Sequence, residues 1–300
     1  MNKIRTAFAA LSDKNTLLLL RVPFSYYLFP VFLFGISQAI NIHAIKLCIV
    51  LFAQHFFIYP GSNIYNSYMD KDEGAIGGIE KPPPVTRQMY YVSIIFDVCG
   101  LLLCSLAGWG HVLVMMGYIA FSKAYSWYGI RLKKYPAIGW FSVMFFQGGY
   151  TYMQGNMAAT DNVVLSWFTV QNLEAMLFAS LIIGGSYPLT QIYQHEEDGR
   201  RGDFTISYKL GVMGTFVFTS IFFTLGALVA LHYFYTYFSL THFLIFLICL
   251  APVVVYFTGW MLKTNKDASH ANYKNAMFMN KISATCMIVC FLIITYINHS

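Results

Sequence analysis

Eight of the 13 carboxylate side chains in this 300-residue sequence fall in two short windows. The first window, NIYNSYMDKDEGAIGGIEKPPP, begins at Asn63, and the second, YQHEEDGRRGDFTIS, begins at Tyr193. The acids are, in chain order, Asp70, Asp72, Glu73, Glu80, Glu196, Glu197, Asp198 and Asp203. Carboxylate and amide oxygens are hard ligands that suit Mg²⁺, which proteins usually bind through a few carboxylates together with substrate phosphates. The two windows therefore predict a site that holds a diphosphate through bridging Mg²⁺ ions.

Each window places an amide one helical turn before an acid. Asn66 and Asp70 are four residues apart and so share one face of a helix. Gln194 and Asp198 repeat that spacing, with Glu197 beside them. Glycines follow both sets, and we expect both helices to break there. A run such as DKDEG is also typical of a solvated loop, but two matched clusters at the ends of apolar helices favour a site, because ionisable groups at a membrane are costly to bury.

The composition identifies the class of protein in which these windows lie. The chain is 57% hydrophobic and only 11% charged, whereas soluble domains carry about 25% charged residues. A transmembrane helix needs about 20 mostly apolar residues. Nine segments qualify, at 22–41, 45–66, 89–108, 110–128, 138–156, 175–195, 211–234, 243–262 and 277–297. Their continuous apolar runs exclude the alternating strands of a transmembrane barrel. The predicted fold class is an all-α integral membrane protein with nine transmembrane helices in one bundle.

The basic residues predict the orientation of that bundle. If the N-terminus is cytoplasmic, only Lys46 of the 19 Lys and Arg residues falls on the opposite side, in agreement with the positive-inside rule. We therefore expect a multi-pass protein of the inner (cytoplasmic) membrane with its C-terminus outside. Residues 1–20 show no signal-peptide cleavage site, and Ile4, Phe8 and Leu11 share one helical face, which predicts a cytoplasmic helix lying on the membrane surface.

The charge pattern also bears on partners. No basic stripe with interleaved aromatic residues indicates nucleic-acid binding, so the net charge of +6 reports membrane orientation. The expected partners are membrane lipids and the small-molecule substrates, and the sequence leaves the oligomeric state open.

Cations accompany both acidic windows and the loop GIRLKKYP between the fourth and fifth predicted spans. They are Lys81, Arg87, Arg131, Lys133, Lys134, Arg200 and Arg201. Taken singly, most of them are typical of residues that set topology or contact lipid headgroups. As a set converging on two acidic clusters, they would also bind the oxygens of an anionic leaving group.

The two windows stand in similar surroundings, at the cytoplasmic ends of the second and sixth predicted spans. Four crossings separate them, so both face the same compartment. We interpret this as a pseudo-repeat in which two four-helix units surround a central cavity and each presents one cluster. Residues 1–300 are predicted to form a single membrane domain.

At these residues the chain resembles the UbiA superfamily of intramembrane prenyltransferases. NSYMD, with KP near residue 81, resembles the family signature NDxxDxxxD, and YQHEEDGRRGDFT resembles the signature DxxxD followed by glycine and threonine. Asn66 and Asp70 match the Asn and the middle Asp of the first signature. Asp198 matches the second Asp of the later one, with Gly202 and Thr205 after it. The resemblance covers essentially the whole chain and implies the family's nine-helix fold.

Three positions depart from the family pattern. Ser67 replaces the leading Asp of the first signature, Gly74 takes the place of its last Asp, and Gln194 replaces the first Asp of the second signature. Extra acids close by would compensate. The resemblance then implies Asp70, Asp72, Glu197 and Asp198 as metal ligands, with Asn66, Gln194, Arg87 and Lys134 at the diphosphate–Mg²⁺ site.

The resemblance implies transfer of a prenyl group from a polyprenyl diphosphate to a lipophilic acceptor, such as an aromatic quinone or pigment precursor, with release of diphosphate. Mg²⁺ and cations would stabilise the departing diphosphate, and a dry, aromatic chamber would protect the allylic carbocation. The tyrosines nearest the motifs are Tyr65, Tyr68, Tyr125 and Tyr128. The expected catalytic residues are Lys81, Tyr125, Arg131 and Lys133.

Two other functions stay open. A UbiA-like terpene cyclase would direct the carbocation onto its own chain, and the altered aspartate pattern fits that reaction as well. A cation-coupled transporter would also carry intramembrane acids, although its site would lie near the bilayer midplane. The sequence determines neither the prenyl chain length nor the acceptor, for which a quinone precursor, a pigment precursor and a lipid phosphate all stay open.

Two polar residues fall within predicted spans and away from the motifs. Asp97 is expected to pair with a nearby hydroxyl or amide, and a role in orienting or deprotonating the acceptor is the alternative. His55 is expected to be a core histidine with satisfied hydrogen bonds.

Overall fold

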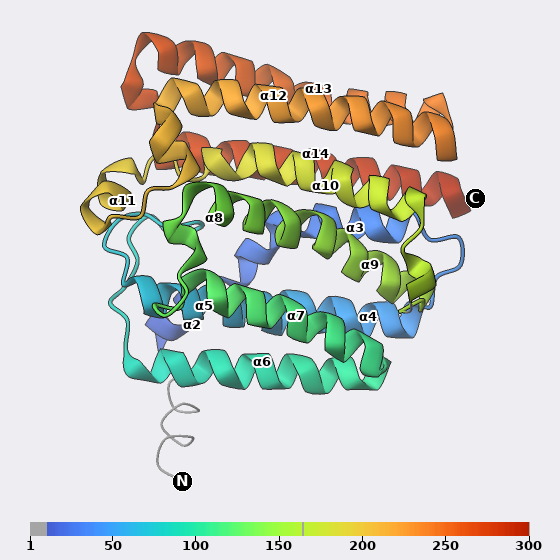
Figure 1. Cartoon of the computed structure of the whole chain (residues 1–300), viewed down its shortest axis with the longest axis horizontal. Helices are drawn as coiled ribbons and strands as arrows, with labels where there is room; N and C mark the ends of the chain where they lie inside the picture. The colour runs from blue at the N-terminus through green and yellow to red at the C-terminus, as the bar shows by residue number, and fades with distance from the viewer. Residues whose placement is uncertain (1–10, 164, 300) are drawn as a thin grey trace. The chain divides into compact units, whose positions relative to one another are not determined.

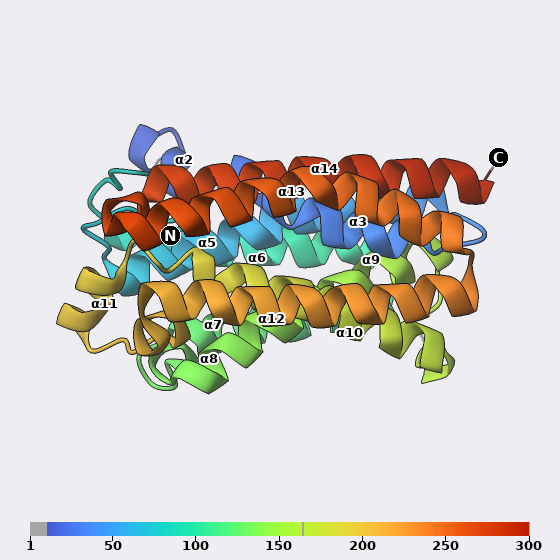
Figure 2. The ribbon, with the colours of Figure 1, turned by 90° about the horizontal axis from the view of Figure 1, so that it is seen from above.

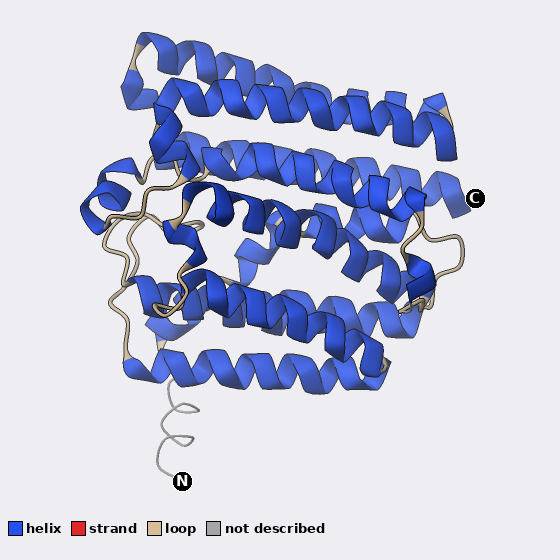
Figure 3. Cartoon of the chain, viewed as in Figure 1, coloured by secondary structure: helices blue, strands red, loops and turns tan. Residues whose placement is uncertain are grey.

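The computed structural model describes residues 11–163 and 165–299. Within these ranges the chain forms helices joined by loops and turns (Figure 3). The only strand-like pairing among the described residues is an isolated bridge between Ile76 and Ile79. The predicted all-helical class is confirmed. The expected surface helix within residues 1–20 lies partly outside the described residues, which begin at Leu11; α2 (Lys14–Leu20) covers its last part.

The described residues divide into two compact units. Unit 1 contains residues 11–26 and His43–Leu132, and unit 2 contains Tyr27–Ile42 and residues 133–299. This grouping differs from the expected two runs of four spans, because α3 (Phe29–Ser37), in the first predicted span, belongs to unit 2.

Close backbone approach explains why α3 belongs to unit 2. A Cβ atom on Gly35 would lie only 2.6 Å from the backbone nitrogen of Asn156, and the Asn156 amide donates to the Gly35 carbonyl at 2.9 Å. Glycines in membrane helices permit this kind of contact, since they let two backbones approach. α3 is therefore fastened to a later helix of the chain, which the local pattern of spans does not reveal.

Unit 1 is built from three long helical segments and α2. The first segment is continuous through α4 (Ala44–Ala53), the π-helical turn η2 (Gln54–Ile58) and α5 (Tyr59–Asp70), and α6 (Arg87–Ala107) and α7 (Trp109–Ser126) follow it (Figure 1). α5 packs against α2, α6 and α7. Pro60 has no N–H to donate and its ring would clash with the carbonyl four residues earlier, so the wider π-helical turn accommodates it.

Unit 2 contains α3 and the helical elements that follow residue 135. In chain order they include α8 (Pro136–Val143), the π-helical turn η4 (Met144–Gly149) and α9 (Tyr150–Thr160), then α10 (Val170–Leu189), the short α11 (His195–Arg201), α12 (Ile206–Tyr237), α13 (Leu240–Lys266) and α14 (Tyr273–His299). α12, α13 and α14 run side by side (Figures 1 and 2). An aromatic core joins α9, α10, α12 and α14 to α3, because the buried Phe34 ring contacts Tyr152, Phe178, Tyr233 and Phe291.

Among the described residues, five helical segments are long and apolar enough to cross a membrane. They are Ala44–Asp70, Arg87–Ala107, Ile206–Tyr237, Leu240–Lys266 and Tyr273–His299, and a sixth counts if the bent pair Lys14–Tyr27 and Phe29–Ser37 is one span. Every predicted span overlaps a described helix. The protein is therefore a multi-pass helical membrane protein, while the total of nine crossings and their orientation stay predictions.

Candidate functional site

The first cluster, Asn66, Asp70 and Asp72, lies at the C-terminal end of α5 and just beyond it. Asn66 and Asp70 share one face of this helix, as their spacing predicts. The expected glycine break is wrong at this end. Lys71 adopts the left-handed conformation (φ 52°), and its N–H donates to the Ser67 carbonyl at 2.9 Å, which ends the helix before Gly74.

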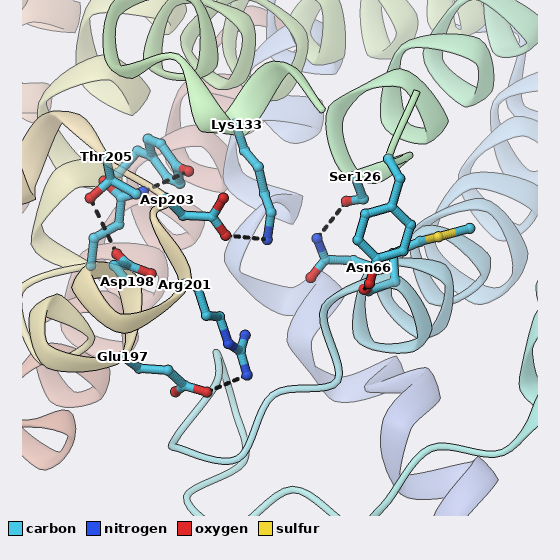
Figure 4. A network of polar contacts seen from close by, with 12 residues as sticks. Asn66, Ser126, Lys133, Glu197, Asp198, Arg201, Asp203 and Thr205 are labelled. Carbon is cyan, nitrogen blue, oxygen red and sulfur yellow. Dashed lines mark hydrogen bonds and ion pairs between the residues drawn. The ribbon is translucent and has the colours of Figure 1, made fainter. Parts of the chain in front are cut away.

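Hydrogen bonds within unit 1 tie the first cluster to the end of α7. The Asn66 side-chain amide donates to the Ser126 hydroxyl at 2.6 Å (Figure 4). The Tyr128 hydroxyl donates to the Met69 carbonyl, and the Arg131 guanidinium lies 5.1 Å from the centre of the Tyr128 ring. Arg131, an expected catalytic cation, is thereby attached to the helix that carries Asn66.

Asp70 of the first cluster and the neighbouring Ser67 are both largely shielded from solvent. Asp70 is 9% exposed, and Ser67 is 2% exposed with no described hydrogen-bond partner for its hydroxyl oxygen. Ser67 stands where the family signature has an acid. A buried hydroxyl can supply one neutral oxygen ligand there but no charge.

The second cluster, Glu197, Asp198 and Asp203, is placed differently from the prediction. α10 carries Pro188 near its end and stops at Leu189, so the acids do not end the sixth span. They follow on α11, with Gln194 as its N-cap residue and Glu197 and Asp198 in its first turn. The helix dipole favours carboxylates at this position. Gly202 (φ 70°) ends α11, as expected.

Ion pairs and a hydrogen bond surround these acids (Figure 4). Arg201 pairs with Glu197 at 2.5 Å, and the Lys133 ammonium lies 3.6 Å from the buried Asp203 carboxylate. The turn after Gly202 returns Thr205 to α11, where its hydroxyl donates to Asp198 at 3.3 Å. Sequence reasoning placed Asp203 in the second window but gave it no role; its contact with Lys133 depends on the fold of unit 2.

Burial dominates the electrostatics of Asp198. Desolvation raises the pKa of this carboxyl to about 7, although the charge of Lys133 and the hydrogen bond from Thr205 oppose the rise. Near neutral pH such a carboxylate readily exchanges its proton for a metal ion or another cation.

His195 was not predicted, and it fastens α11 to the kinked start of α12. Its Nε2 lies 2.7 Å from the Ser207 hydroxyl, which lies 2.9 Å from the Thr215 hydroxyl. Thr215 donates to the carbonyl of Gly211, whose φ of 69° makes the kink. Burial lowers the pKa of His195, so at neutral pH the chain of contacts runs through a neutral imidazole.

Other expected site residues are less engaged. Lys81, Arg87 and Lys134 are exposed, and among the described residues no hydrogen bond or ion pair joins them to either cluster. Tyr125 is half-buried, with its ring 6.4 Å from that of Phe121.

The expectation for Asp97 is wrong about its partner. Asp97 forms an ion pair at 2.8 Å with Lys123, which lies inside α7 and not in a cytoplasmic loop. A buried carboxylate needs such a counter-charge, because leaving it unpaired in apolar surroundings is expensive. The Lys123 ammonium also lies 4.2 Å from the centre of the Tyr65 ring. His55 is buried, with Nδ1 3.2 Å from the Leu51 carbonyl, as expected for a core histidine.

The donor set fits a metal shared with a phosphate better than an all-protein cage. Across residues 11–163 and 165–299, no three His, Cys, Asp or Glu side chains are grouped to hold a metal ion by themselves. Mg²⁺ needs only one or two carboxylates when phosphate oxygens and waters complete its coordination. The half-buried Asp198, whose pKa is raised by desolvation, has the chemistry of such a ligand.

Comparison with known proteins gives a consistent assignment of the fold. A structure of a UbiA homologue from Archaeoglobus fulgidus bound to DMAPP and Mg²⁺ matches with a TM-score of 0.68 and 15% identity, over 94% of this chain and 99% of that chain. The same homologue bound to GPP and Mg²⁺ gives a TM-score of 0.66 and 17% identity, over 94% and 99%. A structure of digeranylgeranylglyceryl phosphate synthase gives 0.60 and 20%, over 100% and 99%.

Sequence comparison decides the family. Curated protein sequences give no match. The profile described as the UbiA prenyltransferase family matches residues 27–282, which is most of the 300-residue chain. The chain is therefore a member of the UbiA prenyltransferase family, an enzyme that transfers a prenyl group from a prenyl diphosphate.

Proposed function

We propose that the protein catalyses the Mg²⁺-dependent transfer of a prenyl group from a polyprenyl diphosphate to a lipophilic acceptor in the membrane. The observation that carries this proposal is the second cluster. There the half-buried Asp198 carboxyl, with a pKa near 7, accepts a hydrogen bond from the Thr205 hydroxyl, while Lys133 pairs with the neighbouring Asp203. The related structures with bound Mg²⁺ and prenyl diphosphates support the same reading.

The proposed metal ligands are Asp70, Asp72, Glu197 and Asp198. When bound there, Mg²⁺ would neutralise charge on the diphosphate and so make it a better leaving group. Asn66 and Gln194 would offer amide groups to the same anion. Ser126 fixes the direction of the Asn66 amide, since it accepts one of its two hydrogens.

Cations of this chain would act on the leaving oxygens. We propose that Arg131 and Lys133 donate hydrogen bonds to the diphosphate as its bond to the prenyl carbon breaks and both bonding electrons stay with the oxygen. Arg131 is held by the Tyr128 ring and Lys133 by Asp203. Lys81, Arg87 and Lys134 are exposed, so they would attract the anion over a longer distance without touching it.

The acceptor supplies the electron pair for the new bond, and it loses a proton. An aromatic acceptor fits the ring-rich interior, and Tyr125 is the candidate for stabilising positive charge on the prenyl carbon. One face of Tyr65 already carries the Lys123 ammonium, so that face does not serve the carbocation.

The positive-inside pattern supports a cytoplasmic N-terminus and an outer C-terminus.

The decisive experiment follows diphosphate release from purified protein in nanodiscs. Prenyl diphosphates of several chain lengths are supplied with a membrane lipid extract, with and without Mg²⁺, and organic products are identified by mass. Mg²⁺-dependent release with a prenylated acceptor supports the proposal. A cyclic hydrocarbon as the sole product would replace it with the cyclase, and no release from folded protein at any chain length contradicts both.

Site variants test the ligand assignment in the same assay. Asp70→Ala and Asp198→Ala are each expected to lower turnover at least about 100-fold, as loss of a direct ligand exceeds the usual outer-shell effect. Glu80→Ala, an exposed acid of the first window, is the matched control and should retain activity. Turnover retained in both ligand variants would refute the site, provided that thermal unfolding shows all three proteins to be folded.

A further inference from the structure

The ion pair between Lys123 and Asp97 lies within helices of unit 1 and outside the proposed ligand set. The ammonium and carboxylate are 2.8 Å apart, and their side chains are 21% and 10% exposed. Charged side chains inside membrane helices are expensive and usually mark functional positions. An apolar pair would hold α6 against α7 at lower cost, so the charges call for an explanation beyond packing.

The carboxylate also contacts the helix that carries the first cluster. Oδ1 of Asp97 has no described hydrogen-bond partner, and a Cβ atom on Gly61 of α5 would lie 3.0 Å from it. Glycine at position 61 therefore lets the carboxylate lie directly against the backbone of α5. A Cβ there would also meet Phe96 Cβ at 3.1 Å, so any larger residue would move α5 away from α6.

The ammonium contacts α5 a second time, through an aromatic ring. Lys123 Nζ lies 4.2 Å from the centre of the Tyr65 ring, within the range of a cation–π contact, which strengthens where water is excluded. Tyr65 immediately precedes Asn66. The pair is thus the centre of a three-helix clamp, in which Asp97 of α6 and Lys123 of α7 both contact α5.

The clamp lies close to the first cluster along both α5 and α7. Lys123 precedes Ser126 by three residues, and Ser126 accepts the hydrogen bond from Asn66. Gly61 precedes Asn66 by five residues, and Tyr65 precedes Asp70 by five residues, or about 7.5 Å along α5. A shift of α5 at the clamp would therefore move Asn66 and Asp70 relative to α7.

We propose that Asp97 and Lys123 are positioning residues that fix the register of α5 and so hold Asn66 and Asp70 where they bind the Mg²⁺–diphosphate. This inference rests on the proposed function and assigns neither residue contact with substrate. The polar clamp suits the task because a cation–π contact and an ion pair both depend on direction and distance, whereas apolar side chains can slide past one another.

The main test replaces both charges together. Asp97→Asn/Lys123→Met keeps the approximate shape of both side chains and leaves no buried charge unpaired, so the variant is expected to fold. Lys123→Arg keeps the positive charge and can still stack on Tyr65. Tyr65→Phe keeps the ring, and Tyr65→Leu removes it. Glu174→Gln/His232→Gln removes the carboxylate and the imidazole of a hydrogen-bonded pair of unit 2 that touches neither cluster, and it serves as control.

Two readouts separate positioning from general stability. In nanodiscs, amide exchange of residues 61–70 should rise in the double variant and in Tyr65→Leu, while residues 206–237 keep wild-type exchange. With geranylgeranyl diphosphate, the KM values for diphosphate and Mg²⁺ should rise about tenfold, the usual effect of outer-shell partners, with kcat nearly unchanged. Lys123→Arg and Tyr65→Phe, each made in the wild-type protein, should keep both the amide exchange and the KM values near those of the wild type.

Each other result overturns the inference. Unchanged exchange at residues 61–70 would show that the clamp does not hold α5. A fall in kcat with constant KM would indicate direct chemistry by Asp97, and a lower melting temperature with normal KM would indicate packing alone. Wild-type protein that releases no diphosphate would refute the proposed function separately, because the exchange measurement still decides whether the clamp orders α5.

Discussion

The two clusters hold their polar side chains by different means. In the first, the described contacts include neutral hydrogen bonds, from Asn66 to Ser126 and from Tyr128 to Met69, with the Arg131 guanidinium near the Tyr128 ring. In the second they include ion pairs, of Glu197 with Arg201 and of Asp203 with Lys133. One cluster is set by the geometry of three packed helices and the other by charge on a helix of seven residues.

Helix direction deepens that contrast. Asp70 lies at the C-terminal end of α5, where the helix dipole is negative and disfavours a carboxylate. Glu197 and Asp198 lie in the first turn of α11, where the dipole favours them. The comparison teaches that similar sequence windows can reach the same donor chemistry from opposite helix ends.

The largest effect is expected from the cation of the second cluster. Lys133→Met removes the ion pair of Asp203, which is 4% exposed, and removing one partner of a buried pair costs about 3–5 kcal/mol of folding free energy. Turnover should also fall at least about 100-fold, because Lys133 is a proposed diphosphate ligand. Thermal unfolding and diphosphate release measure the two effects.

A second substitution separates these effects. Lys133→Met/Asp203→Leu leaves no half of the pair behind and should regain most of the stability without regaining turnover. Recovery of turnover would show that Lys133 acts only by neutralising Asp203. It would then contradict the proposal that the second cluster uses the charge of Lys133 to bind the diphosphate.

A middle-sized effect is expected from neutral hydrogen bonds at either cluster. Ser126 is 1% exposed, and Ser126→Ala leaves one N–H of the Asn66 side-chain amide without its acceptor. An unsatisfied buried donor of this kind lowers the free energy of unfolding by about 1–3 kcal/mol. Thr205→Val removes a longer bond, 3.3 Å, to a carboxylate that keeps Lys133 nearby. We expect Ser126→Ala to raise the KM for prenyl diphosphate about tenfold and Thr205→Val to raise it less. Steady-state kinetics with the reverse order would contradict the contrast drawn above.

The last effect is a pH dependence of stability without metal. The pKa of Asp198 is raised from 3.8 to about 7 by burial, so the folded protein binds this proton more tightly than the unfolded chain does. The contribution of this group is fully present below pH 4 and is lost as the pH rises to 7. The melting temperature in EDTA should therefore fall over that range for this group.

Asp198→Asn provides the control for that measurement. The variant should show a flatter melting profile between pH 4 and pH 7, and Mg²⁺ with diphosphate should restore wild-type stability most at pH 8. A wild-type profile identical to that of Asp198→Asn would mean that Asp198 is solvated and titrates normally.

Much of the fold was predictable because the membrane imposes a simple pattern. Apolar runs of the required length placed a helix at every predicted span, since backbone groups in lipid must be satisfied within the segment. Helix ends were less predictable. The sixth predicted span runs to residue 195, yet α10 stops at Leu189 just after Pro188, and the acidic residues beyond begin a new helix.

The site was predictable in its residues but not in its contacts. The spacing of Asn66 and Asp70 identified their shared face, because both lie on one regular helix. Lys123 was grouped with the cytoplasmic cations because charge counting ignores depth, and its pairing with Asp97 depends on how α6 and α7 pack. His195 shows no local signal that separates it from a solvated loop histidine; only its contact with Ser207 does.

The π-helical turn Gln54–Ile58 has a consequence for how this enzyme can change over evolution. Such a turn accommodates one residue more than an α-helical turn, so it behaves as a single-residue insertion within the span. Loss of one residue there, for instance the half-exposed Phe56, would rotate the preceding Ala44–Ala53 by about 100° and leave α5 in place. The half of this span before the turn can therefore change in length and surface while the half that bears Asn66 keeps its alignment.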